Sequence, residues 1–333
     1  TVLTERTLKL DKRGEKVLFI NGTGTRSQST SKSLMSLELE EQFKKVPNVS
    51  FMTLSSQEIV KLTEPFNKYR LQYNFNTTEF MQKFKDQNYH LVIDEFILQT
   101  KGKKGGMRDI QETANLFNGL SKHFKSVWIC LSRGYLTKML FEKNVDDYFS
   151  QIESWFLGWY LPKLQYPLRG GSEIVEFVKT ENDVFLKQPS KGQIQLPSLH
   201  IDNMKIPENL CTSYTVEVFE GEEAIKMIED LDFSAVFGKM GAENNFLIII
   251  EENLFNIIFH EGSNMKRQNQ PIFYHTARQD NQSHVKDWTK GNKKCDLITD
   301  IFHAAGFEAE FVIVFGSRTS LSAASRATSK LEI

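Results

Sequence analysis

The stretch VLFINGTGTRSQSTSKSL, residues 17–34, joins a run of apolar residues to a polar segment that ends near Lys32 and Ser33. The apolar run VLFIN predicts a buried β-strand, because β-branched and aromatic side chains are typical of such strands. The polar segment is rich in small residues, and a helix-like segment follows it. A strand, a small-residue loop and a helix that begins at Lys-Ser are the parts of a phosphate-binding loop. The stretch therefore predicts an α/β fold with a nucleotide site.

In a phosphate-binding loop, backbone N–H groups form a nest, a lysine contacts the β- and γ-phosphates, and a hydroxyl binds Mg²⁺. Lys32 and Ser33 occupy the positions of the lysine and the hydroxyl, and Gly22 and Gly24 supply glycines at the start of the loop. The loop departs from the pattern GxxxxGK[ST]: Ser31 replaces the glycine before the lysine, and Lys32 follows Gly22 by ten positions, more than in the pattern. The alternative is a polar strand-to-helix connection that binds nothing.

A second acidic element follows in the chain. In residues 90–96 the apolar run LVI leads directly into Asp94 and Glu95. At such a strand end in P-loop NTPases, an aspartate holds Mg²⁺ through water and a neighbouring glutamate can polarise the attacking water. The alternative is an acidic strand end that faces solvent.

Further strand-like and helix-like segments alternate along the chain. The strand-like runs are residues 16–20, 49–54, 90–96, 126–131, 161–168, 245–252, 271–277 and 309–316. The helix-like segments are residues 32–45, with Met35, Leu39 and Phe43 on one face, and residues 170–179 and 222–231. Buried strands that alternate with helices predict parallel sheets covered on both faces.

With these elements in place, the chain resembles the superfamily-1 helicases of the UvrD/Rep type. Residues 20–33 resemble their motif I, residues 49–55 motif Ia, residues 92–96 motif II and residues 126–134 motif III. In the second half, LQYPLRGGSEIVEFV resembles motif IV and contains Arg169, and DLITDIFHAAGFEAEFVIVFG resembles motif V and contains Gly306 and Glu308. The final SLSAASRATSKLEI resembles motif VI, with Ser325, Arg326 and Ala327 matching.

The resemblance implies two RecA-like lobes, over residues 1–155 and 156–333, with a loop-rich insertion around residues 181–210. ATP and Mg²⁺ would lie between the lobes. The first lobe would supply Lys32, Ser33, Asp94 as a magnesium ligand and Glu95 as the residue that orients water. The second would supply Gly306 and Glu308 beside the nucleotide, and Arg169 and Arg326 to stabilise charge on the γ-phosphate.

The same resemblance leaves three functions open. One is an ATPase that acts on single-stranded DNA or RNA. Another is a catalytically degenerate nucleotide sensor or interaction module, which the Ser31 substitution and the loss of the motif III glutamine favour. The third is a nucleic-acid-binding pseudo-helicase without hydrolysis.

The composition and charge of the chain indicate its class and its cellular compartment. The 333 residues carry a formal net charge of −1 and are 40% hydrophobic, which is typical of globular domains. Three widely spaced cysteines and the lack of a signal-peptide pattern predict an intracellular protein, cytoplasmic or nuclear, and no apolar run is long enough to span a bilayer. The sequence begins with Thr1 instead of Met and stops abruptly at Ile333. We therefore expect it to be a piece of a longer chain that carries further domains.

Overall fold

The computed structural model divides the chain into two compact units. One unit comprises Thr1–Lys32 with Ser36–Pro162, and the other comprises Ser33–Met35 with Lys163–Ile333. The boundary predicted at residue 155 and the RecA-like identity of the units stay predictions. The structure describes residues 2–22, 32–54, 88–96, 114, 117–131, 154, 156–161, 176, 180, 215–217, 246–250, 272–275, 285, 286, 288, 296–300, 303, 304, 307, 309–315 and 327–332.

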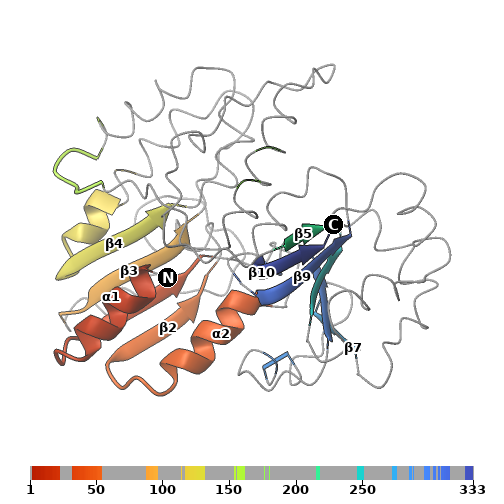
Figure 1. Ribbon diagram of the computed structural model, residues 1–333. Helices are drawn as coiled ribbons and strands as arrows, with labels where there is room; N and C mark the ends of the chain where they lie inside the picture. Colours follow the sequence, from red (N-terminus) through yellow and green to blue (C-terminus); the bar gives the residue numbers. More distant parts are fainter. Residues whose placement is uncertain are drawn as a thin grey trace, which may run out of the picture. The chain divides into compact units, whose positions relative to one another are not determined.

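The first unit contains a parallel four-stranded sheet with the order β2-β1-β3-β4 (Figure 1). Its strands are β1 (Val17–Asn21), β2 (Val49–Thr53), β3 (His90–Phe96) and β4 (Ser126–Leu131), at the positions that the sequence predicts. Every residue of β1 is buried, and Glu95 is the one residue of β3 that is not fully buried. Such continuous apolar runs are typical of parallel strands covered on both faces.

Helix α2 (Leu34–Phe43) covers one face of this sheet beside β1 and β2. The ring of Phe43 lies 4.9 Å from that of Phe19 on β1 and 5.8 Å from that of Phe51 on β2. Met35, Leu39 and Phe43 are all buried, as their helical spacing predicts. Helix α1 (Val2–Asp11) precedes β1 and contacts both β1 and β3.

The opposite face is covered by helical residues that precede β4. Phe117 packs edge-on against Phe96, with ring centroids 5.0 Å apart. Phe19 pairs in register with Val92, whereas the register shift between Ile93 and Phe96 places Phe96 on the same face as Ile93. Since side chains alternate along a strand, Phe96 and Phe19 lie on opposite faces. The connection from β1 to β2 therefore covers one face and the connection from β3 to β4 covers the other, as in a doubly wound sheet, and the strand order matches the flavodoxin-like order of such sheets.

The second unit contains a parallel six-stranded sheet with the order β5-β10-β9-β6-β8-β7. Phe246 packs on Phe311, and Trp288 packs on Phe307, so aromatic side chains contribute to the core of this unit as well. The strands are β5 (Thr215–Glu217), β6 (Leu247–Ile250), β7 (Ile272–His275), β8 (Asp296–Asp300), β9 (Ala309–Phe315) and β10 (Ala327–Glu332).

The α/β class and the parallel arrangement of both sheets are confirmed. Strands β6, β7 and β9 lie where the sequence predicts them, whereas β5, β8 and β10 were not predicted. The predicted strand at 161–168 lies almost wholly outside the described residues, and the helix at 222–231 and the insertion at 181–210 lie outside them completely. Among the helices that the structure describes, none is long and apolar enough to cross a membrane.

We expect Phe43→Ala to lower the free energy of unfolding by about 3–5 kcal/mol, because it opens a cavity beside Phe19. Phe51→Ala is the matched control: Phe51 touches the same ring at 6.0 Å but is only half-buried, so it should cost less. Urea unfolding followed by circular dichroism measures both, and equal losses would contradict this account of the packing.

Candidate functional site

The carboxyl ends of β1 and β3 form the topological switch point of the first sheet. β1 leads through α2 on one face to β2, and the neighbouring β3 leads through helical residues on the other face to β4. In open α/β sheets, ligands bind outside the carboxyl ends of the strands at such a point. The residues at this edge are therefore the candidate site.

Gly22, the first residue after β1, lies against the backbone at the end of β3. Its N–H donates a hydrogen bond to the carbonyl oxygen of Asp94 at 2.7 Å. A Cβ atom at this position would lie 2.6 Å from the carbonyl oxygen of Glu95 and 3.1 Å from that of Asp94. No side chain fits there, so the sheet requires a glycine at the start of the predicted loop.

Asp94 and Glu95 form a bulge at the end of β3. Ile93 pairs with Ile129 and Phe96 with Leu131, so two residues of β3 stand opposite one residue of β4. Glu95 has a φ of 54°, in the left-handed region that costs a non-glycine residue energy. Its N–H donates to the carboxylate of Asp94 at 3.1 Å, which holds the turn. The bulge brings the two predicted acidic residues together with different exposures: Asp94 is 2% exposed, and Glu95 is half-buried.

Cys130 is the residue of β4 opposite this bulge. Burial, together with the neighbouring carboxylates of Asp94 and Glu95, raises the pKa of the Cys130 thiol to about 12. The thiol is therefore neutral at physiological pH beside two acidic residues. Sequence reasoning missed this residue, although a cysteine at the end of the next predicted strand was a usable signal.

A buried polar contact ties the end of β1 to α2. The side-chain amide of Asn21 donates to the hydroxyl of Ser36 at 2.8 Å, and both residues are fully buried. The carbonyl of Asn21 accepts from the N–H of Leu54, just after β2, at 3.1 Å. These bonds fix the start of α2 and the end of β2 relative to β1, on either side of the predicted loop.

Lys32 and Ser33 stand just before α2. The ammonium of Lys32 lies 2.9 Å from the carboxylate of Glu40 on α2, and its side chain is 42% exposed. Ser33 is buried. The lysine predicted to contact phosphate is thus paired with a carboxylate on the helix that follows it.

The structure therefore brings together three of the predicted site residues, Gly22, Asp94 and Glu95. Within the described ranges, no group of three histidine, cysteine or acidic side chains forms a ready metal site. The other predicted site residues, Gly24, Arg169, Gly306, Glu308 and Arg326, lie outside the described residues.

No known protein family matches the chain, and no curated protein matches it. Among solved structures, a similar one is the crystal structure of the Hef helicase domain of Pyrococcus furiosus, with 7% sequence identity and a TM-score of 0.29 over 99% of this chain and 88% of that chain. The similarity is too low to assign a family. What the fold defines is an α/β protein with two parallel sheets and a candidate site at the switch point of the first.

We expect Gly22→Ala to destabilise the protein by about 1–3 kcal/mol, because the added methyl group overlaps the carbonyl of Glu95. Gly119→Ala is the control: a Cβ there meets no atom within 4 Å, and alanine favours the helical conformation of that residue. Urea midpoints of the two variants give the comparison. A Gly22→Ala protein as stable as the Gly119→Ala protein would rule out the close approach.

We expect Cys130 to react slowly with iodoacetamide at pH 8, because only the thiolate attacks and a pKa of about 12 leaves very little of it. The rate should be at least about a hundredfold below that in urea, measured by mass spectrometry of the peptide that contains Cys130. Asp94→Asn should speed the reaction, since it removes a negative charge that opposes the thiolate. Similar rates in folded and unfolded protein would contradict the assigned environment.

Proposed function

We propose that the chain is the core of a helicase-like P-loop NTPase, and that it binds Mg²⁺ and ATP with the phosphates at the carboxyl edge of the first sheet. The observation that carries the proposal is the packing of Gly22 against the Asp94–Glu95 bulge at the switch point. That packing joins the first residues of the predicted phosphate loop to the predicted acidic pair, which such a site needs within reach of one ligand.

In this proposal each residue has a distinct role. Asp94 holds the hydrated Mg²⁺ ion, and Glu95 orients the attacking water. The half-buried side chain of Glu95 suits contact with water, and the buried Asp94 suits a fixed ligand. Lys32 contacts the β- and γ-phosphates, and the hydroxyl of Ser33 completes the metal shell.

The ion pair between Lys32 and Glu40 must open for this role. A partly exposed pair of this kind contributes about 0–1 kcal/mol. A hydrogen bond from an ammonium to a charged phosphate is worth about 1.5–3 kcal/mol. The phosphate therefore displaces Glu40 from Lys32, and Glu40 is a weak competitor for the lysine.

The second unit and the partners complete the proposal. Arg169 and Arg326 would stabilise charge on the γ-phosphate, and Gly306 and Glu308 would contact the nucleotide from the second lobe, as the helicase resemblance implies. Single-stranded DNA or RNA would be the polymer acted on, and other domains of a longer parent chain would direct it. Steep salt dependence of binding would identify such a nucleic-acid partner.

A second candidate is a catalytically degenerate nucleotide sensor or interaction module. The pairing of Lys32 with Glu40 and the serine at position 31 favour it. If the chain is an interaction module, the strand-to-helix loop persists, but Lys32 pairs with Glu40 on α2 and no phosphate competes for it.

Titration calorimetry with Mg·ATP separates a nucleotide-binding core from an interaction module. For the NTPase core, we expect Lys32→Ala to weaken binding about tenfold or more. Glu40→Gln should strengthen binding by up to about fivefold, because it releases the lysine. Glu41→Gln is the matched control, since Glu41 lies next to Glu40 on the same helix but pairs with Lys44.

If Lys32→Ala binds Mg·ATP as tightly as the parent chain does, Lys32 does not contact the phosphates. If the parent chain shows no heat of binding at millimolar Mg·ATP, the NTPase proposal fails and the interaction module stands.

A further inference from the structure

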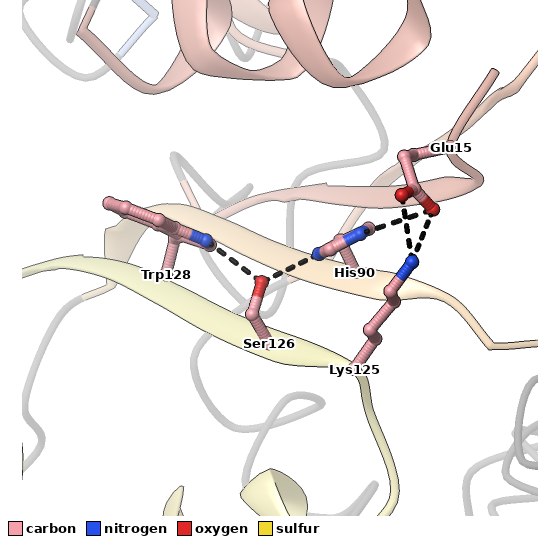
Figure 2. A network of polar contacts seen from close by, with 5 residues as sticks. All are labelled: Glu15, His90, Lys125, Ser126 and Trp128. Atoms are coloured by element: carbon pink, nitrogen blue, oxygen red, sulfur yellow. Dashed lines mark hydrogen bonds and ion pairs between the residues drawn. The ribbon is translucent and has the colours of Figure 1, made fainter. Parts of the chain in front are cut away.

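A network of polar side chains lies at the amino ends of β3 and β4, the edge of the sheet opposite the candidate site. Figure 2 shows its members, Glu15 from the turn before β1, His90 at the start of β3, and Lys125, Ser126 and Trp128 at the start of β4. Lys125 contacts both carboxylate oxygens of Glu15 at 2.7 Å. His90 lies between Ser126, 2.7 Å from its Nδ1, and Glu15, 3.6 Å from its Nε2. We call these five residues the amino-edge network.

The carboxylate of Glu15, 3.6 Å from Nε2, favours one tautomer of His90. A carboxylate repels a nitrogen lone pair, so Nε2 carries the ring hydrogen and Nδ1 is the acceptor. The hydroxyl of Ser126 must then donate to Nδ1. The indole N–H of Trp128 donates to the oxygen of the same hydroxyl at 2.9 Å. The hydrogen bonds therefore run in one direction, from Trp128 through Ser126 to a neutral His90.

Burial opposes the protonation of His90. The residue is 7% exposed, and its Nε2 is buried without a hydrogen-bond partner within normal distance. The charged groups near it are Glu15 from the turn, Lys125 from just before β4 and Arg6 from α1. The guanidinium of Arg6 lies over the ring of Trp128 at 4.5 Å. Burial lowers the pKa of His90, the charges of Lys125 and Arg6 lower it further, and Glu15 only partly opposes them.

We propose that the amino-edge network is an acid-released latch, in which protonation of His90 loosens α1 and the edge strand β4 from β3. A protonated His90 donates from both nitrogens, so the hydroxyl hydrogen of Ser126 loses its acceptor. The new positive charge is also repelled by those of Lys125 and Arg6, with Glu15 as the neighbouring carboxylate.

Loosening would be local because of how β4 and α1 are held. Among the described strands of this sheet, β4 pairs with β3 alone and lies at the end of the order. The stacking of Arg6 on Trp128 joins α1 to the same strand. β1, by contrast, is hydrogen-bonded on both sides by β2 and β3. Strands at an edge open at lower free energy than central ones.

The direction of the pH effect follows from linkage. The folded protein binds the proton at His90 more weakly than an unfolded histidine does. The stabilisation that the neutral His90 contributes is therefore fully present above pH about 6.5, and it is lost as the pH falls below that value. One proton changes the opening equilibrium by at most about tenfold per pH unit. Carboxylates such as Glu5 and Glu15, whose pKa values are lowered by their lysine partners, do not titrate between pH 7.5 and 5.5.

Hydrogen exchange of the whole chain at pH 7.5 and 5.5, corrected for intrinsic rates, tests the latch. We expect opening of peptides from α1 and β4 to increase several-fold and up to about tenfold on acidification, with β1 unchanged. His90→Gln should abolish the increase, because glutamine can bond to Ser126 and does not titrate. His123→Gln is the matched control, an exposed histidine of the same unit, and should leave the response intact.

The latch is overturned if His90→Gln and the parent respond alike, or if α1 and β4 do not open more than β1. If His90→Gln does not fold, nitrogen NMR of the parent still decides. A hydrogen on Nε2 and titration below pH 6.5 support the latch, and a hydrogen on Nδ1 or titration at or above pH 6.5 overturns it. None of these readouts depends on nucleotide binding.

Discussion

The contact between Gly22 and the carbonyl oxygens of Asp94 and Glu95 is the constraint on which the first unit depends. It sets how closely the ends of β1 and β3 approach, and the N–H of Gly22 satisfies the carbonyl of Asp94. Because the bulge of β3 directs the carbonyl of Glu95 toward β1, a side chain at position 22 would have to displace one of the two strands. The start of the loop, the acidic pair and the register of β3 on β4 are thus parts of one arrangement.

The sequence predicted the elements whose apolar runs are unbroken. β1, β3, β6 and β9 are buried over most of their length, and a continuous apolar run is a strong signal for such strands. β8 begins and ends in aspartate, and Asp296 is buried because its carboxylate accepts from the N–H of Phe246. A buried aspartate held by a distant backbone group leaves no periodic signal, so β8 was read as part of a motif and missed as a strand.

The candidate site was predictable in its residue types but not in its contacts. The Asp94–Glu95 pair was found from the strand that precedes it. Its geometry depends on how β4 pairs with β3, which sets the bulge, the left-handed conformation of Glu95 and the position of Cys130. Strand pairing cannot be predicted from the sequence of either strand alone. The pairing of Lys32 with Glu40 could have been predicted from the sequence, because Glu40 lies on the helix that begins just after the lysine. It was missed because the motif assigned Lys32 to phosphate only.

Glu95 itself bears on the choice between an active and a degenerate site. A non-glycine residue in the left-handed conformation costs about 1–2 kcal/mol, which glycine would largely avoid. Burial of the Glu95 side chain offsets little of this conformational energy, because that side chain is only half-buried while its neighbours Asp94 and Phe96 are buried. Strained residues of this kind persist where a side chain is needed at a site, and the inference runs from the observed strain to the function. A carboxylate held in this conformation at the switch point favours an acidic pair that acts on a ligand over a loop that only connects two elements.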